Sequence, residues 1–244
     1  SKANRTLYEF LLPHEQEMGE KPIINHTIIK ADLRGSTDIT HQMNERGLNP
    51  ASYFSLNFFD PISEILSEYD AHKVFIEGDA IILSIFEQED TPSGWYSVAR
   101  ACGMAINMLM IINRYNKKSQ EYQLPILELG IGICHRADAP TFLFDGDNRI
   151  MISPAINLAD RLSGCHKTVR HIIRKNISPF NLFVFQGASD EEVEKTADDL
   201  FLRYNVNGIE LNEAGFRKLA QEIDLKPFFG DIPVIGWLFK KRSD

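Results

Sequence analysis

Two aspartates that follow apolar, strand-like runs could hold a divalent cation. Asp32 comes directly after the β-branched run 26–31 and precedes a glycine-bearing turn, and Asp79 lies in the turn of an expected hairpin over 73–85. Carboxylates fixed at strand ends beside free backbone N–H groups suit Mg²⁺ that carries phosphates, because Mg²⁺ completes its octahedron with water and phosphate oxygens. Either aspartate alone could be a helix cap or a turn former, so the predicted metal site rests on the pair.

An amide and a guanidinium form a second candidate group. Asn157 and Arg161 lie four residues apart in an expected helix over 153–162, which Pro154 suits at its first turn. They therefore share one helix face and could orient a ribose and neutralise charge on a transferring phosphoryl group. The alternative is a solvated polar face, or a salt bridge from Arg161 to a nearby acid.

Helices and strands alternate along the chain in a way that would position these residues. Apolar residues at helical spacing predict helices near 49–69, with a possible restart at Pro61, and near 93–120. The remaining expected elements are strands at 126–135 and 200–206, a hairpin or flap within 136–149, and a helix at 212–223.

Composition is that of a globular protein and excludes several function classes. The chain has 244 residues, of which 43% are hydrophobic and 25% charged, and its net charge of -8 argues against binding nucleic acid or an anionic membrane. Its three cysteines lack metal-ligand spacing, and neither a P-loop lysine nor a Gly-x-Ser-x-Gly elbow is present. We expect a cytoplasmic protein without stable membrane association.

Four segments, taken in order, give the chain a family resemblance. ADLRGST (31–37), EGDAIILSIF (77–86), ELGIGI (128–133) and SPAINLADRL (153–162) together resemble the class III nucleotidyl cyclase catalytic domain. The resemblance implies an α/β fold of the α+β sandwich kind, with a ferredoxin-like βαββαβ core and flanking helices. We accordingly expect an N-terminal arm over 1–22, the catalytic domain over 23–210, and a C-terminal helix with an apolar tail over 211–244.

The same resemblance assigns roles to particular residues. Asp32 and Asp79 would bind two ions, Mg²⁺ or Mn²⁺, in each active site, and the Leu33 carbonyl could complete a metal shell. Asn157 and Arg161 would orient the ribose and stabilise the pentavalent phosphorus from the other subunit of a homodimer, so that each active site is composite. The substrate would be a nucleoside triphosphate and the product its 3′,5′-cyclic monophosphate. The backbone N–H groups expected to cradle phosphate oxygens are those of Arg34, Gly35, Ser36 and Thr37.

Departures from the family pattern point to an altered base pocket. Phe75 and Ile150 occupy the positions where purine cyclases carry polar base-reading residues, and neither side chain can hydrogen-bond a base edge. Intact metal and phosphate residues with a substituted base pocket look like the pyrimidine cyclases of the Pycsar antiphage systems. That likeness implies a UTP substrate, with CTP second, and a cyclic product read by a separate effector protein. Phe75 could instead be a buried core residue of the hairpin.

Two rival functions remain open at this stage. One is an adenylate or guanylate cyclase with an atypical base pocket, and the other is a non-catalytic nucleotide-binding regulatory domain. The second is favoured by Asn207, which replaces a lysine that contacts the triphosphate in many family members. Arg34, Arg203 or a lysine within 167–175 could substitute for that lysine. The apolar segment 227–239 is expected to dock on its own domain or on the partner, with membrane anchoring as the alternative.

Overall fold

The computed structural model describes residues 9–11, 22–145, 148–164, 184–186, 208–222, 227–229 and 232–233. Its strands are β1 (Glu9–Leu11), β2 (Ile23–Leu33), β3 (Ala71–Glu77), β4 (Ala80–Gln88), β5 (Leu129–Arg136), β6 (Thr141–Asp145), β7 (Asn148–Ile152), β8 (Val184–Gln186), β9 (Gly208–Leu211), β10 (Pro227–Phe229) and β11 (Ile232–Pro233). Its helices are α1 (Ser36–Glu45), α2 (Pro50–Phe54), α3 (Asp60–Glu64), α4 (Ser97–Glu121), α5 (Pro154–Ser163) and α8 (Glu213–Glu222), with a π-helical segment at Ser55–Phe59 and a 3₁₀ helix at Leu66–Tyr69.

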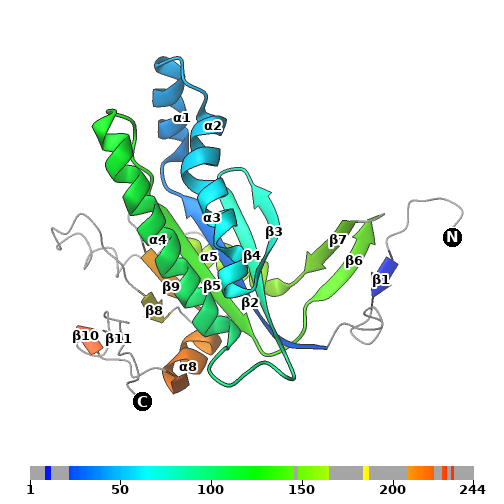
Figure 1. The fold of residues 1–244 in the computed structure, drawn as a ribbon. Coiled ribbons are helices and arrows are strands. Elements are labelled where there is room, and N and C mark those ends of the chain that lie inside the picture. Colours follow the sequence, from blue (N-terminus) through cyan, green and yellow to red (C-terminus); the bar gives the residue numbers. More distant parts are fainter. Residues whose placement is uncertain are drawn as a thin grey trace, which may run out of the picture.

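A six-stranded sheet with the order β3-β4-β2-β5-β9-β8 forms the centre of the protein (Figure 1). β2 pairs antiparallel with both β4 and β5, β3 continues the antiparallel pairing at one edge, and β9 adds in parallel to β5. Because β2 is central and both of its faces are covered, its residues 26–33 are all buried, which explains the continuous β-branched run in the sequence.

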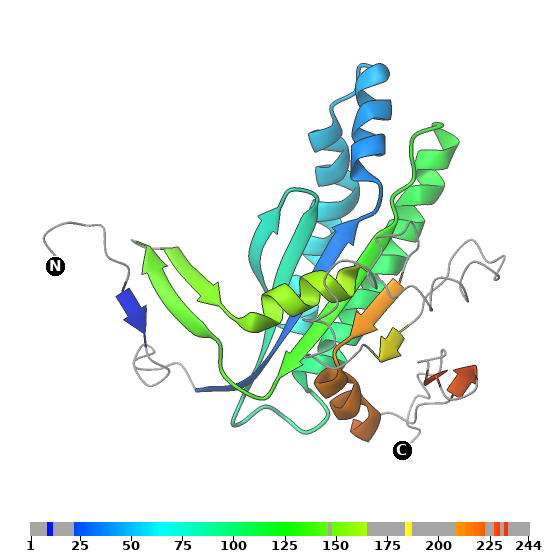
Figure 2. The same ribbon diagram turned by 180° about the vertical axis from the view of Figure 1, so that it is seen from behind.

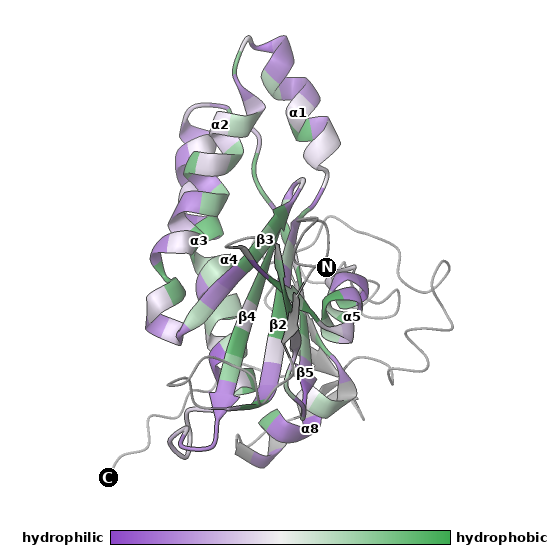
Figure 3. Cartoon of the chain, turned by 90° about the vertical axis from the view of Figure 1, so that its right-hand side faces the viewer, coloured by the Kyte–Doolittle hydropathy of each residue, from purple (hydrophilic) through white to green (hydrophobic). Residues whose placement is uncertain are grey.

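Helices cover the two faces of this sheet differently. α4 packs against one face, where Ile29 and Ala31 of β2 meet helix residues such as Met104 and Met108 in the larger core cluster. α5 crosses the opposite face, as Figure 2 shows, in a smaller cluster that includes Ile28 of β2. Successive strand residues point to opposite faces, so β2 supplies both clusters alternately. Hydrophobic residues accordingly gather along the central strands (Figure 3).

Two glycines of β5 let α5 lie directly on the sheet. A methyl group at Gly132 would overlap the carbonyl oxygen of Ala159 and the backbone N of Ser163. At Gly130 the space above the strand is filled by the guanidinium of Arg34. The ELGIGI segment therefore determines how closely the helix that carries the candidate amide and guanidinium approaches the strands.

The hairpin of β6 and β7 projects away from the main sheet and pairs with β1 in a separate three-stranded sheet (Figure 1). This agrees with the hairpin expected within 136–149, although the strands extend to Ile152. The helix expected at 49–69 is present as a nearly continuous stretch, in which Pro61 lies in the first turn of α3. The strand expected at 200–206 and most of the apolar tail lie outside the described residues.

Candidate active site

The ends of β2 and of the β3–β4 hairpin bring the two predicted metal aspartates to the same end of the sheet. Asp32 is the register partner of Ala80, the residue that follows Asp79. The backbone N–H of Leu33 donates to the carbonyl oxygen of Asp79 at 3.3 Å. Gly78, with φ of 60°, allows the tight turn between the two strands. The carboxylates of Asp32 and Asp79, beside the backbone carbonyl of Leu33, are hard oxygen donors. They fit Mg²⁺ or Mn²⁺, which take few protein ligands.

The segment expected to cradle phosphates begins differently from the prediction. The backbone N–H of Arg34 donates to the carbonyl oxygen of Glu128 at 2.8 Å, so it is not available to a phosphate. That part of the prediction is wrong, because the backbone of Arg34 is still paired with the residue that directly precedes β5. Gly35 then adopts a left-handed conformation with φ of 62°, and Ser36 begins α1. The amides of Ser36 and Thr37 lie in a first helical turn, where backbone N–H groups have no intrahelical acceptor.

The side chain of Arg34 is buried between β5 and α5. It is 4% exposed, lies over Gly130 and donates to the carbonyl oxygen of Ser163 at the C-terminal end of α5. A cation is favoured at that end of a helix. Arg34 therefore fastens α5 to the sheet, and the sequence-based option that it replaces the missing lysine has no support in the structure.

α5 carries Asn157 and Arg161, and its start is well defined. The Oγ of Ser153 accepts from the N–H of Ala155 at 3.1 Å and lies 2.6 Å from Nε2 of the buried His26, which ties the N-terminus of the helix to β2. Asn157 is exposed and Arg161 is half-buried. The helix residues buried against the sheet side are Ala155, Leu158, Ala159, Leu162 and Ser163. Asn157 and Arg161 thus lie on the same side of α5, away from its buried residues.

The two predicted base-pocket residues are both surface residues of this chain. Phe75 on β3 and Ile150 on β7 are each 40% exposed. β3 is an edge strand and its register shifts between Lys73 and Phe75, so that His72 and Phe75 both lie opposite residues on the α5 side of the sheet. The alternative that Phe75 is a buried core residue is therefore wrong.

Sequence reasoning missed a charged cluster on the same side of the sheet. The ammonium of Lys30 lies 3.0 Å from Oε2 of Glu77 and 2.6 Å from Oδ1 of Asp160. Burial alone would lower the pKa of Lys30, but the hydrogen bonds to Asp160 and Glu77 raise it above its ordinary value. A lysine inside the β-branched run 26–31, two residues before Asp32 and so on the same face, was the available signal.

Comparisons with known proteins bear on the fold. No family model and no curated protein sequence matches the chain. Among solved structures, the adenylyl cyclase CyaB from P. aeruginosa is 19% identical, with 65% of this chain and 85% of that chain covered at a TM-score of 0.50. The guanylate cyclase domain of RhGC from Catenaria anguillulae, in complex with GTP, is 16% identical, with 58% and 72% covered at a TM-score of 0.43.

The fold is that of a class III cyclase catalytic domain. The predicted fold class is thereby confirmed. In the part of the chain that is described, this class III fold contains no group of three or more His, Cys, Asp or Glu side chains that could hold a metal ion. A pair of carboxylates is nevertheless enough for a cation that a bound triphosphate also coordinates. None of the described helices is long and apolar enough to cross a membrane.

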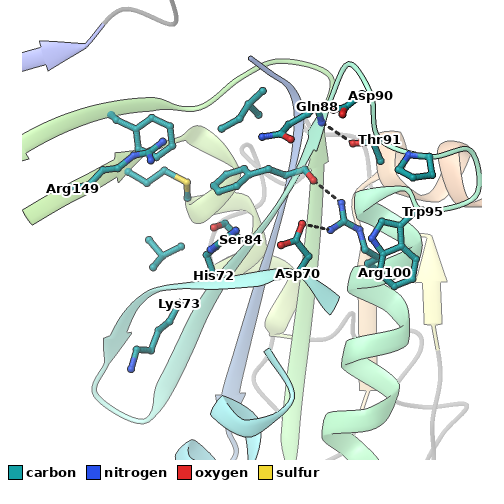
Figure 4. Close-up of a pocket in the computed structure, with 16 residues that line it drawn as sticks. Asp70, His72, Lys73, Ser84, Gln88, Asp90, Thr91, Trp95, Arg100 and Arg149 are labelled. Carbon is teal, nitrogen blue, oxygen red and sulfur yellow. Dashed lines mark hydrogen bonds and ion pairs between the residues drawn. The ribbon is translucent and has the colours of Figure 1, made fainter. Parts of the chain in front are cut away.

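A cavity of about 590 Å³ lies at the other end of the β3–β4 hairpin of this class III fold (Figure 4). Its lining includes His72, Phe86, Trp95, Arg100 and Arg149. Arg100 donates to Asp70 at 3.1 Å and to the carbonyl oxygen of Phe86 at 2.5 Å, which joins α4 to the hairpin. None of the predicted metal, phosphate, ribose or base residues lines this cavity.

Proposed function

We propose that this protein is a metal-dependent nucleotidyl cyclase that converts a nucleoside triphosphate to its 3′,5′-cyclic monophosphate and pyrophosphate. The observation that carries the proposal is the placement of Asp32 and Asp79 at one end of the sheet, joined through the Leu33–Asp79 hydrogen bond, in a class III cyclase fold. The outward position of Asn157 and Arg161 on α5 supports it.

In the proposed reaction, the 3′-oxygen of the ribose forms a bond to the α-phosphorus while the bond from that phosphorus to the β-phosphate oxygen breaks. The 3′-hydroxyl loses its proton to water and pyrophosphate leaves. Two bound ions, Mg²⁺ or Mn²⁺, would lower the pKa of the 3′-hydroxyl and hold the triphosphate. Asn157 would orient the ribose by its amide, and Arg161 would neutralise charge that develops on the phosphoryl oxygens.

The proposed active form is a homodimer with composite sites. Asn157 and Arg161 do not point into the sheet of their own chain, and several apolar side chains of β3 and β7 are left uncovered. Phe75, Ile150 and Ile152 are 40% to 44% exposed in the single chain. A second copy would bury this surface and could bring its own Asn157 and Arg161 to the metal aspartates.

The proposed substrate is a pyrimidine nucleoside triphosphate, with UTP ahead of CTP. Phe75 is exposed where a base could stack on it, and neither Phe75 nor Ile150 offers a hydrogen bond to a purine edge. By its likeness to the antiphage pyrimidine cyclases, we further propose that the product is a second messenger read by a separate effector protein in the bacterial cytoplasm.

The test is incubation of the purified protein with Mn²⁺ or Mg²⁺ and, separately, ATP, GTP, CTP and UTP, with products identified by mass spectrometry. A cyclic pyrimidine monophosphate is expected. A cyclic purine would retain the chemistry but reject the assignment of the base pocket. No product from any of the four, under conditions where the protein is folded and dimeric, would reject the cyclase function.

A further inference from the structure

Lys30 lies between the candidate base residue and the helix that presents the candidate ribose residue. Across the sheet, Phe75 pairs with Ile82, and Ile82 pairs with Lys30, so the three side chains form one row on the α5 side. The ammonium of Lys30 contacts Asp160, which directly precedes Arg161 on α5. It also contacts Glu77, two residues beyond Phe75 on β3.

The neighbouring row leaves room for this contact. Glu77 pairs with Ala80, and Ala80 pairs with Asp32. Because the side chain of Ala80 is a single methyl group, the side chain of Lys30 can extend diagonally over β4 to reach the carboxylate of Glu77. The side chain of Lys30 is only 8% exposed, whereas that of Glu77 is 64% exposed.

The cluster is an unusual way to fasten a helix. An ion pair that includes a buried cation is seldom more stabilising than apolar side chains of the same volume, because both charges lose hydration. Elsewhere, α5 is already held by Leu158, Ala159 and Leu162. An ammonium has three N–H donors, and Glu77 and Asp160 occupy two of them. The exposed carboxylate of Glu77 has a second oxygen that can accept a hydrogen bond.

We propose that Lys30 and Glu77 form the polar part of the nucleobase subsite and select a keto base, uracil, over an amino base. This rests on the proposed cyclase function. The third N–H of Lys30 would donate to the base carbonyl, and Glu77 would accept from the adjacent ring N–H. In cytosine both positions are reversed, because an amino group replaces the carbonyl and an unprotonated nitrogen replaces the N–H. Since Lys30 is the more deeply buried partner, its preference for a carbonyl oxygen decides the outcome.

Two variants test the subsite without removing a proposed metal or phosphate residue. Lys30→Met is unbranched, shorter than lysine by one atom, and lacks the donors, and Glu77→Gln exchanges one acceptor oxygen for a donor group. Lys73→Met is the matched control, because Lys73 lies on the same edge strand, is exposed, and is the register partner of Leu83, whose side chain lies in the core cluster on the α4 side of the sheet. Thermal melts should show that all three variants fold.

The readout is the ratio of kcat/KM for UTP to that for CTP, measured alongside the Kd values of both nucleotides in Ca²⁺. The wild-type protein and Lys73→Met should favour UTP, and Lys30→Met and Glu77→Gln should reduce the ratio by about tenfold or more. An unchanged ratio in folded variants, or a wild-type preference for CTP, would overturn the subsite. If the wild type binds UTP selectively but makes no cyclic product, the cyclase function fails and the Kd ratio alone decides the subsite. Absence of nucleotide binding would reject both.

Discussion

The backbone N–H of Leu33 donates a 3.3 Å hydrogen bond to the carbonyl oxygen of Asp79. This bond connects the last residue of β2 to the turn of the β3–β4 hairpin, 46 positions later in the chain. Both aspartates are therefore attached to one frame of paired strands, and a cation site on strands is more accurately positioned than one on loops.

Removing either carboxylate should abolish turnover and leave the fold intact. Asp32→Asn and Asp79→Asn retain side-chain volume but lose the charge that a divalent ion requires, so we expect kcat to fall by at least about a hundredfold and the activating metal concentration to rise. Cyclic nucleotide production over a Mn²⁺ titration measures both effects. Asp38→Asn, an exposed acid in the first turn of α1, is the control. Undiminished activity in Asp32→Asn would disprove the metal assignment.

Mixing two inactive variants should restore activity if the sites are composite. Asp32→Ala and Arg161→Ala homodimers would each lack half of every site, whereas a mixed dimer keeps one complete site. With random assortment of equal amounts, about a quarter of wild-type activity is expected. Activity after denaturation and joint refolding, compared with each variant refolded alone, gives the answer. If native mass spectrometry detects mixed dimers but activity is not recovered, the composite site is rejected, and Asp32 and Arg161 would act within one chain.

A methyl group on β5 should displace α5. In Gly132→Ala the new methyl overlaps the carbonyl oxygen of Ala159, so the helix must move away from the sheet. We expect a loss of about 1–3 kcal/mol in the free energy of unfolding, together with a large loss of activity, because Asn157 and Arg161 move with the helix. Urea unfolding measures the change in the free energy of unfolding, and kinetic assays measure the loss of activity.

Gly103→Ala on α4 is the milder comparison. Its methyl would lie 3.2 Å from the ring of Tyr69, a partly buried side chain whose tip can shift. This variant should retain activity and stability. Equal effects of the two substitutions would contradict the special role of the contact between α5 and β5.

Stability should fall in acid because of a buried polar network. Burial would raise the pKa of Glu87, but hydrogen bonds from Lys218, Asn25 and Ser97 lower it to about 2. Burial, followed by the charge of Lys218, lowers the pKa of His135 to about 4. Both folded-state values lie below the unfolded ones of 4.5 and 6.5, so in acid the unfolded state binds more protons. The contribution of these groups to the free energy of unfolding is therefore fully present near pH 7. It decreases below pH 6.5 through His135 and through His26, whose pKa burial also lowers, and it decreases further below pH 4.5 through Glu87.

Urea unfolding at pH 7 and pH 5 measures the first of these two steps. His135→Gln should reduce the difference between the two pH values and leave the part that comes from the buried His26, whereas His41→Gln should not reduce it, because the His41 side chain is 76% exposed. The same slope in His135→Gln as in the wild type would assign the acid sensitivity to other groups.

Local patterns in the sequence were sufficient for the strands β2 to β5, for the long helices, and for the positions of the two aspartates at the ends of strands. A β-branched run that must be covered on both faces predicts a central strand, and a residue that follows it must emerge at the end of the sheet. The Ser153-Pro154 start of α5 was readable for the same reason, because an N-cap and a first-turn proline act within one helical turn.

Only the tertiary structure decided which side chains meet. Lys30 and Glu77 are 47 positions apart, and Arg34 and Ser163 are 129 apart, so no local periodicity relates them. Strand order and register bring the first pair together, and the glycines of β5 bring the second together by letting α5 approach the sheet. Phe75 looked equally suited to a core or to a pocket in the sequence. Its exposure follows from the position of β3 at the edge of the sheet, where no further strand or helix of the described residues covers it.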